Sequence, residues 1–235
     1  MTIQQARPTA QSRGWAVPPA LLALSIVPLA AGTLRLLQLG GGPDLMPADP
    51  RYAGFAAPLV AHIAGAAVFA VVGVFQFVPG IRRRHRAWHR RAGRVLVVAG
   101  LVVGVSALWM TLLYAAKPGT GDLLFVLRLV FGSAMVASVV LGFAAIRRRD
   151  IPAHRAWMIR GYALGLGAGT QVFTEGIAQA LFGTTALVND LALGAGWVIN
   201  LAVAEYVIRR PARRRTIRRP ISRPAVRTTA RVGPA

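Results

Sequence analysis

The 235-residue chain contains no cysteine and only seven acidic residues, and Lys117 is the only lysine among its 28 basic residues. The absence of cysteine excludes disulfide bonds, thiolate metal sites and thiol catalysis. So few carboxylates argue against a two-metal centre, and the chain has no phosphate-binding Gly/Lys loop, no His-Glu-x-x-His motif and no nucleophile elbow. We therefore do not expect a hydrolytic enzyme. A membrane redox protein is the one enzyme class that stays open.

Charged residues are scarce as well. They make up 15% of the chain, against about a quarter of a typical soluble domain, while 55% of the residues are hydrophobic. Apolar runs of about 20 residues recur, and each is long enough to cross the hydrocarbon core as a helix. The sequence therefore predicts an all-α integral membrane bundle of six transmembrane helices. The expected spans are residues 15–39, 55–78, 95–116, 123–146, 156–182 and 191–208.

The two ends of the chain differ from this central part. Residues 1–14 are polar and are expected to form a cytoplasmic tail, followed by the transmembrane domain at residues 15–208. The basic start and Ala30-Ala31 also resemble a cleaved signal peptide, but the apolar run continues to Leu37, which favours a retained helix. Residues 209–235 hold ten arginines, four prolines and no acid, so this tail should be disordered.

The basic residues are concentrated in alternate loops. The N-terminus, residues 81–94, residues 147–160 and the C-terminal tail hold 24 of the 28, whereas the other loops carry most of the acids. An excess of Lys and Arg marks cytoplasmic loops, so both termini should be cytoplasmic. The arginine bias is typical of a GC-rich bacterial genome, and we expect the bacterial inner membrane. The basic loops and tail should bind anionic lipid headgroups rather than nucleic acid.

Two segments, residues 81–94 and 154–160, form what we call the basic collar. His85-Arg-Ala-Trp-x-x-Arg91 recurs as His154-Arg-Ala-Trp-x-x-Arg160, through an internal repeat of helical hairpins or by chance in an Arg/Ala-rich chain. Arginine at a helix N-terminus opposes the macrodipole, so helix stability does not explain it. Guanidinium groups with free backbone N–H groups would bind a lipid phosphate, heme propionates or a phosphorylated metabolite. The alternative is topology signalling with tryptophans as interface anchors. The candidate residues are His89, Arg90, Arg94, His154, Arg155, Trp157 and Arg160.

At these residues the chain resembles a bacterial membrane-protein family known as domain of unknown function 2306. The matching features are His62, Gln76-Phe77, His89-Arg90-x-x-Gly93-Arg94 and His154-Arg155-x-Trp157-Met158-x-Arg160. The resemblance covers residues 55–208 and implies a multi-span fold without an established reaction. A looser similarity, by analogy only, links the histidine arrangement to b-type membrane cytochromes.

Heme b is the most specific ligand considered for the collar. Two imidazoles from adjacent helices can ligate heme iron when arginines hold the propionates, and His89 with His154 would meet this requirement. The outer half of the membrane offers only His62, so a second histidine pair is not expected there.

A polar cluster is expected in the outer half of the membrane. His62, Arg128 and Glu175 should lie roughly 8–10 Å below the outer boundary, and Gln171 shares a helix face with Glu175. Charges at this depth normally face a partner or a cavity. The cluster is interpreted either as a structural Arg128–Glu175 ion pair or as the site of a proton-coupled small-solute carrier.

A stripe of small residues, Gly161, Gly165 and Gly169, lies on one face of the expected fifth span. Such a stripe allows close helix contact, either in a homodimer or within one bundle.

Overall fold

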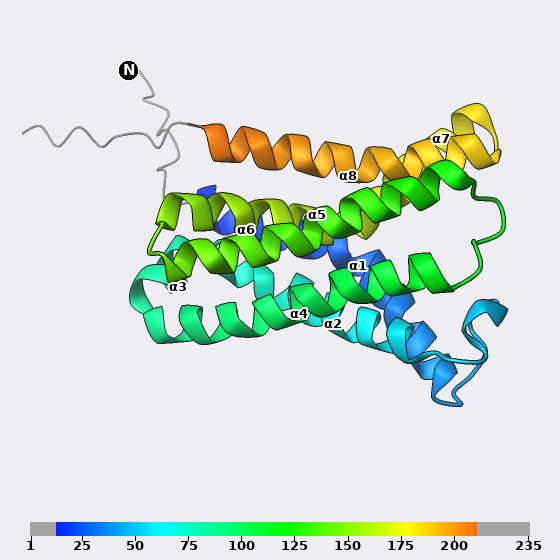
Figure 1. Ribbon diagram of the computed structural model, residues 1–235, viewed down its shortest axis with the longest axis horizontal. Coiled ribbons are helices and arrows are strands. Elements are labelled where there is room, and N and C mark those ends of the chain that lie inside the picture. Colours follow the sequence, from blue (N-terminus) through cyan, green and yellow to red (C-terminus); the bar gives the residue numbers. More distant parts are fainter. Residues whose placement is uncertain (1–12, 211–235) are drawn as a thin grey trace, which may run out of the picture.

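The structure, a computed structural model, describes residues 13–210, and every regular element in this range is a helix (Figure 1). The all-helical part of the predicted fold is therefore confirmed. The two predicted tails lie almost entirely outside the described residues. The elements are α1 (Arg13–Leu39), the 3-10 helix η1 (Pro50–Tyr52), α2 (Ala57–Gln76), α3 (Pro79–Arg84), α4 (Arg86–Leu113), α5 (Asp122–Arg147), α6 (Ile151–Gly165), α7 (Gly167–Phe182) and α8 (Ala186–Arg209).

Five helices, α1, α2, α4, α5 and α8, are long and apolar enough to cross a membrane. The predicted fifth span, residues 156–182, is instead divided between α6 and α7, which have 15 and 16 residues. The structure thus contains five single-helix candidates where six spans were expected.

The break between α6 and α7 lies at Leu166, inside a glycine-rich segment. Asn200 of α8 holds both sides of it. Its Nδ2 donates to the Ala163 carbonyl at 3.0 Å, and its Oδ1 accepts from the Thr170 hydroxyl at 2.7 Å. A freed backbone carbonyl in a membrane needs such a partner, and Asn200 allows the chain to change direction within the bundle.

The core lies where α2, α4, α5 and α6 meet. Val74 and Val139 are almost completely buried, and Phe69 packs against Tyr162. The Tyr162 hydroxyl donates to the Ala70 carbonyl at 2.8 Å, so its polar end is satisfied in the interior. Large apolar side chains such as Val98, which is 63% exposed, cover the outside, as expected for a surface in contact with lipid.

The three glycines of the small-residue stripe pack against neighbouring helices of the same chain. A Cβ at Gly161 would contact Ser138 and Val139 of α5, and a Cβ at Gly165 would reach Phe69 of α2. At Gly169 it would collide with the backbone of α1. The stripe therefore serves close packing within one bundle.

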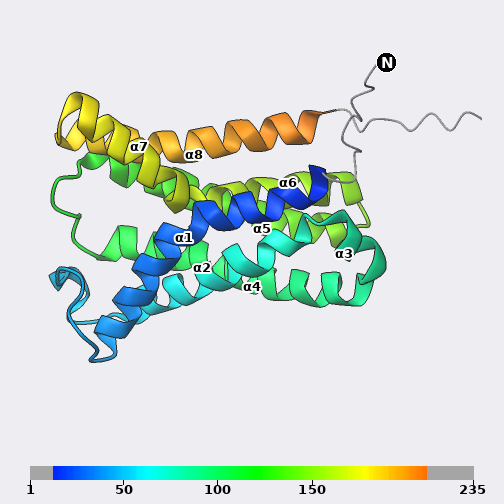
Figure 2. The same ribbon diagram turned by 180° about the vertical axis from the view of Figure 1, so that it is seen from behind.

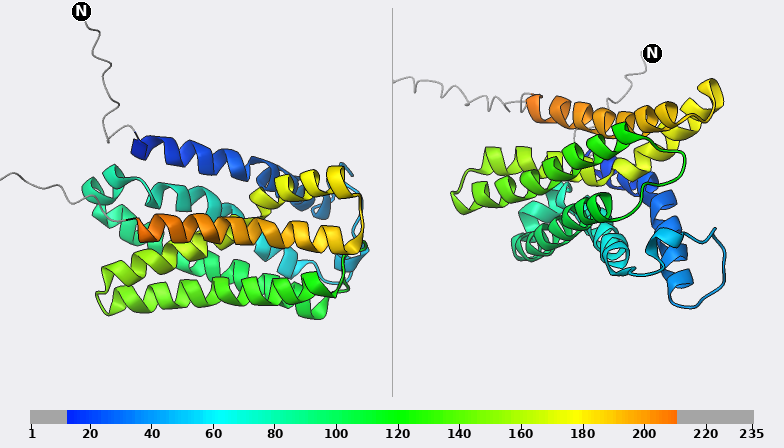
Figure 3. Two further views of the ribbon diagram at one scale, coloured as in Figure 1. Left: turned by 90° about the horizontal axis from the view of Figure 1, so that it is seen from above. Right: turned by 45° about the vertical axis from the view of Figure 1, so that its right-hand side comes forward.

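The bundle has two chemically different ends (Figures 1, 2 and 3). One end, the basic end, holds α3, the starts of α1, α4 and α6, and the last turn of α8. The other, the opposite end, holds the loops at residues 40–56, 114–121 and 183–185 (Figure 3).

Candidate functional site

The basic end carries many arginines and few acids. Asp150 and Glu205 are its only carboxylates within residues 13–210. No arginine of residues 82–94 makes a side-chain hydrogen bond with any residue of 13–210. These guanidinium groups are therefore free to bind an external anion. The exposed arginines at this end are Arg82, Arg83, Arg84, Arg86, Arg90, Arg91, Arg94, Arg147, Arg148, Arg149, Arg155, Arg209 and Arg210.

His154 lies in the first turn of α6 with a fixed ring orientation. Asp150 caps this helix by accepting from the Ala153 amide at 3.0 Å. The His154 Nδ1 bonds the Gly142 carbonyl of α5 at 2.8 Å, which places the proton on Nδ1. Its Nε2 has no partner within the described residues and remains available to a ligand.

His89 lies in the first turn of α4 and has a polar atom that the protein does not satisfy. Its Nδ1 is buried without a hydrogen-bond partner in the described part of the chain, as is the Gln76 Nε2. His154 is close enough to act on His89 electrostatically. Two imidazoles from different helices thus lie at the same end of the bundle, as the sequence predicted.

The two copies of the repeated motif have different surroundings. His85 is exposed between α3 and α4, whereas His154 lies within α6. Trp88 packs edge-on against Phe75. The ring centroid of Trp157, in contrast, lies 4.7 Å from the Arg160 guanidinium carbon. The repetition in sequence therefore does not produce two equivalent sites.

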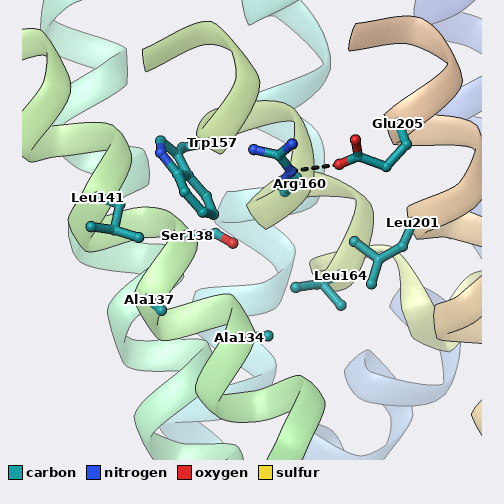
Figure 4. A pocket seen from close by; sticks show the side chains of 9 residues that line it. All are labelled: Ala134, Ala137, Ser138, Leu141, Trp157, Arg160, Leu164, Leu201 and Glu205. Carbon is teal, nitrogen blue, oxygen red and sulfur yellow. Dashed lines mark hydrogen bonds and ion pairs between the residues drawn. The ribbon is translucent and has the colours of Figure 1, made fainter. Parts of the chain in front are cut away.

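Among the described residues, Arg160 is the one collar arginine with a carboxylate partner. Its Nε donates to the Glu205 Oε1 of α8 at 2.6 Å (Figure 4). The Arg209 Nε lies 3.3 Å from the other carboxylate oxygen. The sequence analysis missed Glu205, although an acid near the basic end of a span is an unusual residue there. The pair connects α6 to α8 at the basic end.

Beside this pair, a groove of about 370 Å³ runs between α5, α6 and α8. Figure 4 shows Trp157, Arg160 and Glu205 together at one end of the groove, which we call its mouth, and Ala134, Leu164 and Leu201 toward the other end. The lining residues are Ala134, Ala137, Ser138, Leu141, Trp157, Arg160, Leu164, Leu201 and Glu205.

The residues of the predicted outer cluster do not bind one another. The His62 Nδ1 bonds the Val103 carbonyl and the Ser106 hydroxyl of α4, both at 3.1 Å. Glu175 accepts from Gln179 at 3.3 Å, and Gln171 donates to the Leu193 carbonyl at 2.9 Å.

The expected Arg128–Glu175 ion pair is absent from the described residues. Arg128 instead lies in the electrostatic field of Arg51, Tyr52 and Asp190. Equal depth in the membrane placed Arg128 and Glu175 together in the sequence analysis, but depth does not fix the direction in which a helix points its side chains.

Asp190 is a structural residue of α8, although the expected spans at residues 156–182 and 191–208 left it in the loop between them. It lies in the second turn of α8 and is 1% exposed. Its carboxylate accepts from the Gly121 and Leu124 amides, both at 3.0 Å, and so caps α5 from another helix. Asn189 beside it donates to the Gly119 carbonyl at 2.8 Å and accepts from Gln179. These bonds fix the loop between α4 and α5.

The helices and the two ends together define a multi-pass α-helical membrane protein with one strongly basic end. The chain belongs to the family described as "Predicted membrane protein (DUF2306)", which matches residues 59–208. This match confirms the resemblance seen in the sequence, and it extends from α2 to α8. No curated protein and no solved structure matches the chain, so the similarity to b-type cytochromes stays an analogy.

Proposed function

We propose that the protein is a non-enzymatic membrane protein of the bacterial inner membrane whose basic end binds an anionic group at the cytoplasmic surface. The observation that carries this proposal is the gathering of arginines from α3, α4 and the α5–α6 turn at one end of the bundle, where they have no side-chain partner within residues 13–210. Each basic residue near an anionic bilayer surface contributes about 1 kcal/mol of attraction.

The proposal includes six crossings, with α6 and α7 forming one crossing in two pieces. It also places both termini in the cytoplasm, because short loops rich in arginine stay on that side. The outer residues His62, Arg128 and Glu175 then have structural roles, since each has separate surroundings.

The absence of cysteine makes the orientation directly testable. Cysteine would be introduced singly at Arg149 and at Thr120, and intact spheroplasts carrying each variant would be treated with a membrane-impermeant maleimide. We expect labelling at position 120 and none at position 149 until the cells are lysed. The reverse pattern would refute the orientation.

The anion-binding role can be tested with the purified full-length chain. Phosphatidylglycerol should raise its thermal unfolding temperature more than phosphatidylcholine does. Changing Arg90, Arg91 and Arg94 together to Gln should weaken this preference. Equal effects of both lipids on the wild type would end the proposal.

A second candidate function is one-electron transfer through heme b. It is favoured by the His89 Nδ1 and the His154 Nε2, which have no partner in the described part of the chain and come from different helices at the same end. These residues, with Arg90, Arg94 and Arg155 nearby in sequence, have the chemistry to hold heme iron and propionates. A bound heme would supply the redox centre, and the chain would position and surround it. Purified protein should then show a Soret band that shifts on reduction, and a featureless visible spectrum would exclude this function.

A further inference from the structure

We infer that the groove between α5, α6 and α8 binds one anionic glycerophospholipid, with its phosphate at Arg160 and Trp157 and one acyl chain along Leu164 and Leu201. This inference rests on the proposed function, because it requires the basic end to lie at a membrane surface, and it names the ligand and the place.

The groove has the polarity order of a phospholipid. Trp157, Arg160 and Glu205 lie at its mouth, and Leu164 and Leu201 lie deeper (Figure 4). On α5 the lining extends over eight residues, from Ala134 to Leu141, which is about 10 Å of helix. Ala137 and Leu141 are exposed, so the groove opens sideways toward the surrounding lipid.

Hydrogen-bond donors at the mouth have no acceptor in the protein. Arg160 uses Nε for Glu205, and its two terminal nitrogens have no partner within residues 13–210. The Trp157 indole N–H likewise has none in that part of the chain. A phosphodiester offers charged acceptor oxygens that suit both groups.

The net charge at the mouth also favours an anion. Arg155 donates to the Val207 carbonyl at 3.5 Å, which places it at the end of α8 that also carries Arg209. Together with Arg160, these arginines outnumber the single carboxylate of Glu205. A neutral quinone would gain nothing from this excess.

Ser138 marks the middle of the groove. Its side chain is only 3% exposed, yet its hydroxyl has no hydrogen-bond partner in the described chain, and Figure 4 shows the oxygen directed into the groove. Two other buried serines, Ser25 and Ser106, donate to the carbonyl four residues earlier, at 2.9 and 2.6 Å. Ser138 is thus left to donate to a ligand, and the ester carbonyl of a lipid lies between phosphate and acyl chain.

A second groove provides the contrast. It has a volume of about 550 Å³, lies between α7 and α8, and is lined by apolar residues and Thr174 without any charged side chain. It can hold a hydrocarbon chain but has no group that selects a headgroup.

Native mass spectrometry of the delipidated full-length protein, titrated with dioleoyl-phosphatidylglycerol or dioleoyl-phosphatidylcholine, tests the inference. Ala137→Leu fills the groove from its exposed side, and Arg160→Gln removes the charge. Each change should weaken phosphatidylglycerol binding about tenfold, through lost chain contact or a lost charge-assisted bond. Ala195→Leu, the same change in the uncharged groove, is the matched control and should leave the affinity unchanged.

The outcomes separate the two proposals. Selective binding by the wild type that both groove variants lose and the control retains would support the groove site. Selective binding that Ala137→Leu and Arg160→Gln both retain would overturn the groove site and leave the proposed function standing. Equal binding of both lipids by the wild type would refute both, and displacement of phosphatidylglycerol by a neutral quinone would overturn the choice of ligand.

Discussion

The two ends of the bundle differ in how far their polar side chains are hydrogen-bonded within the chain. At the opposite end, Asp190, Asn189 and Gln179 bond to one another's helices or to the adjacent loop. At the basic end, the arginines of residues 82–94 have no bonded partner within the described chain, and the Nδ1 of His89 is buried without one. Polar groups that are satisfied internally stabilise the fold, whereas unsatisfied donors at a surface are available to a ligand. We therefore propose that the polar groups of the opposite end stabilise the fold and that those of the basic end bind a ligand.

The largest expected effect is at Asp190. Replacing it with Ala would remove the acceptor of two buried amides and the cap of α5, which should cost about 3 kcal/mol of stability. Unfolding in SDS measures this loss. The matched control is Asp122→Ala, because Asp122 is exposed in the first turn of the same helix and should contribute less than about 1 kcal/mol. Similar losses for both variants would remove the basis for calling this end structural.

Asn200 should have the next largest effect. Asn200→Leu would leave the Ala163 carbonyl unpaired beside the helix break, at a cost of about 2 kcal/mol. Thr170→Val removes only the second bond and should cost about 1 kcal/mol in the same SDS titration. If Thr170→Val proved the more damaging, the carbonyl would not be what Asn200 stabilises.

Glu205 sharpens the comparison because its carboxylate pairs with an arginine of the basic end. Its pair with Arg160 is partly exposed, with side chains 26% and 29% accessible, so Glu205→Gln should lower stability by less than about 1 kcal/mol. The same change frees Arg160 and should raise the affinity for phosphatidylglycerol. A weaker affinity, measured by native mass spectrometry, would mean that Glu205 positions Arg160 rather than competes for it.

The smallest effect concerns acid stability at the opposite end. The side-chain hydrogen bond from Arg51 lowers the pKa of Asp49 below its usual value. A lowered folded-state pKa stabilises the protein above the unfolded pKa, and this contribution disappears as the pH falls through the folded one. Asp49→Asn should therefore cost less than about 1 kcal/mol at neutral pH and nothing near pH 2. A loss of stability that persists at pH 2 would contradict this explanation.

The sequence predicted those features of the fold that depend only on where a residue lies along its own helix. The spans at residues 55–78 and 123–146 lie close to α2 and α5, because apolar length alone determines them. It also placed His89 and His154 at one end, because alternate loops of a helical bundle lie on the same side.

The sequence did not reveal relations that depend on helix rotation or on distant partners. Asp190 caps amides about 70 residues away, and Asn200 satisfies a carbonyl 37 residues away. Residues 156–182 were expected to form one continuous helix. The break at Leu166 was not expected because its stabilising partner, Asn200, lies on a different helix. Arg128 and Glu175 were expected to pair from depth alone, which ignores rotation about the helix axis.

We propose that anionic lipid, from outside the chain, accepts hydrogen bonds from the free donors of the basic end. The most direct test is to unfold the wild type, Asp190→Ala and Arg160→Gln in nanodiscs with and without phosphatidylglycerol. We predict that phosphatidylglycerol stabilises the wild type and the Asp190 variant equally, and stabilises Arg160→Gln less. Equal stability of the wild type in both bilayers would contradict the account.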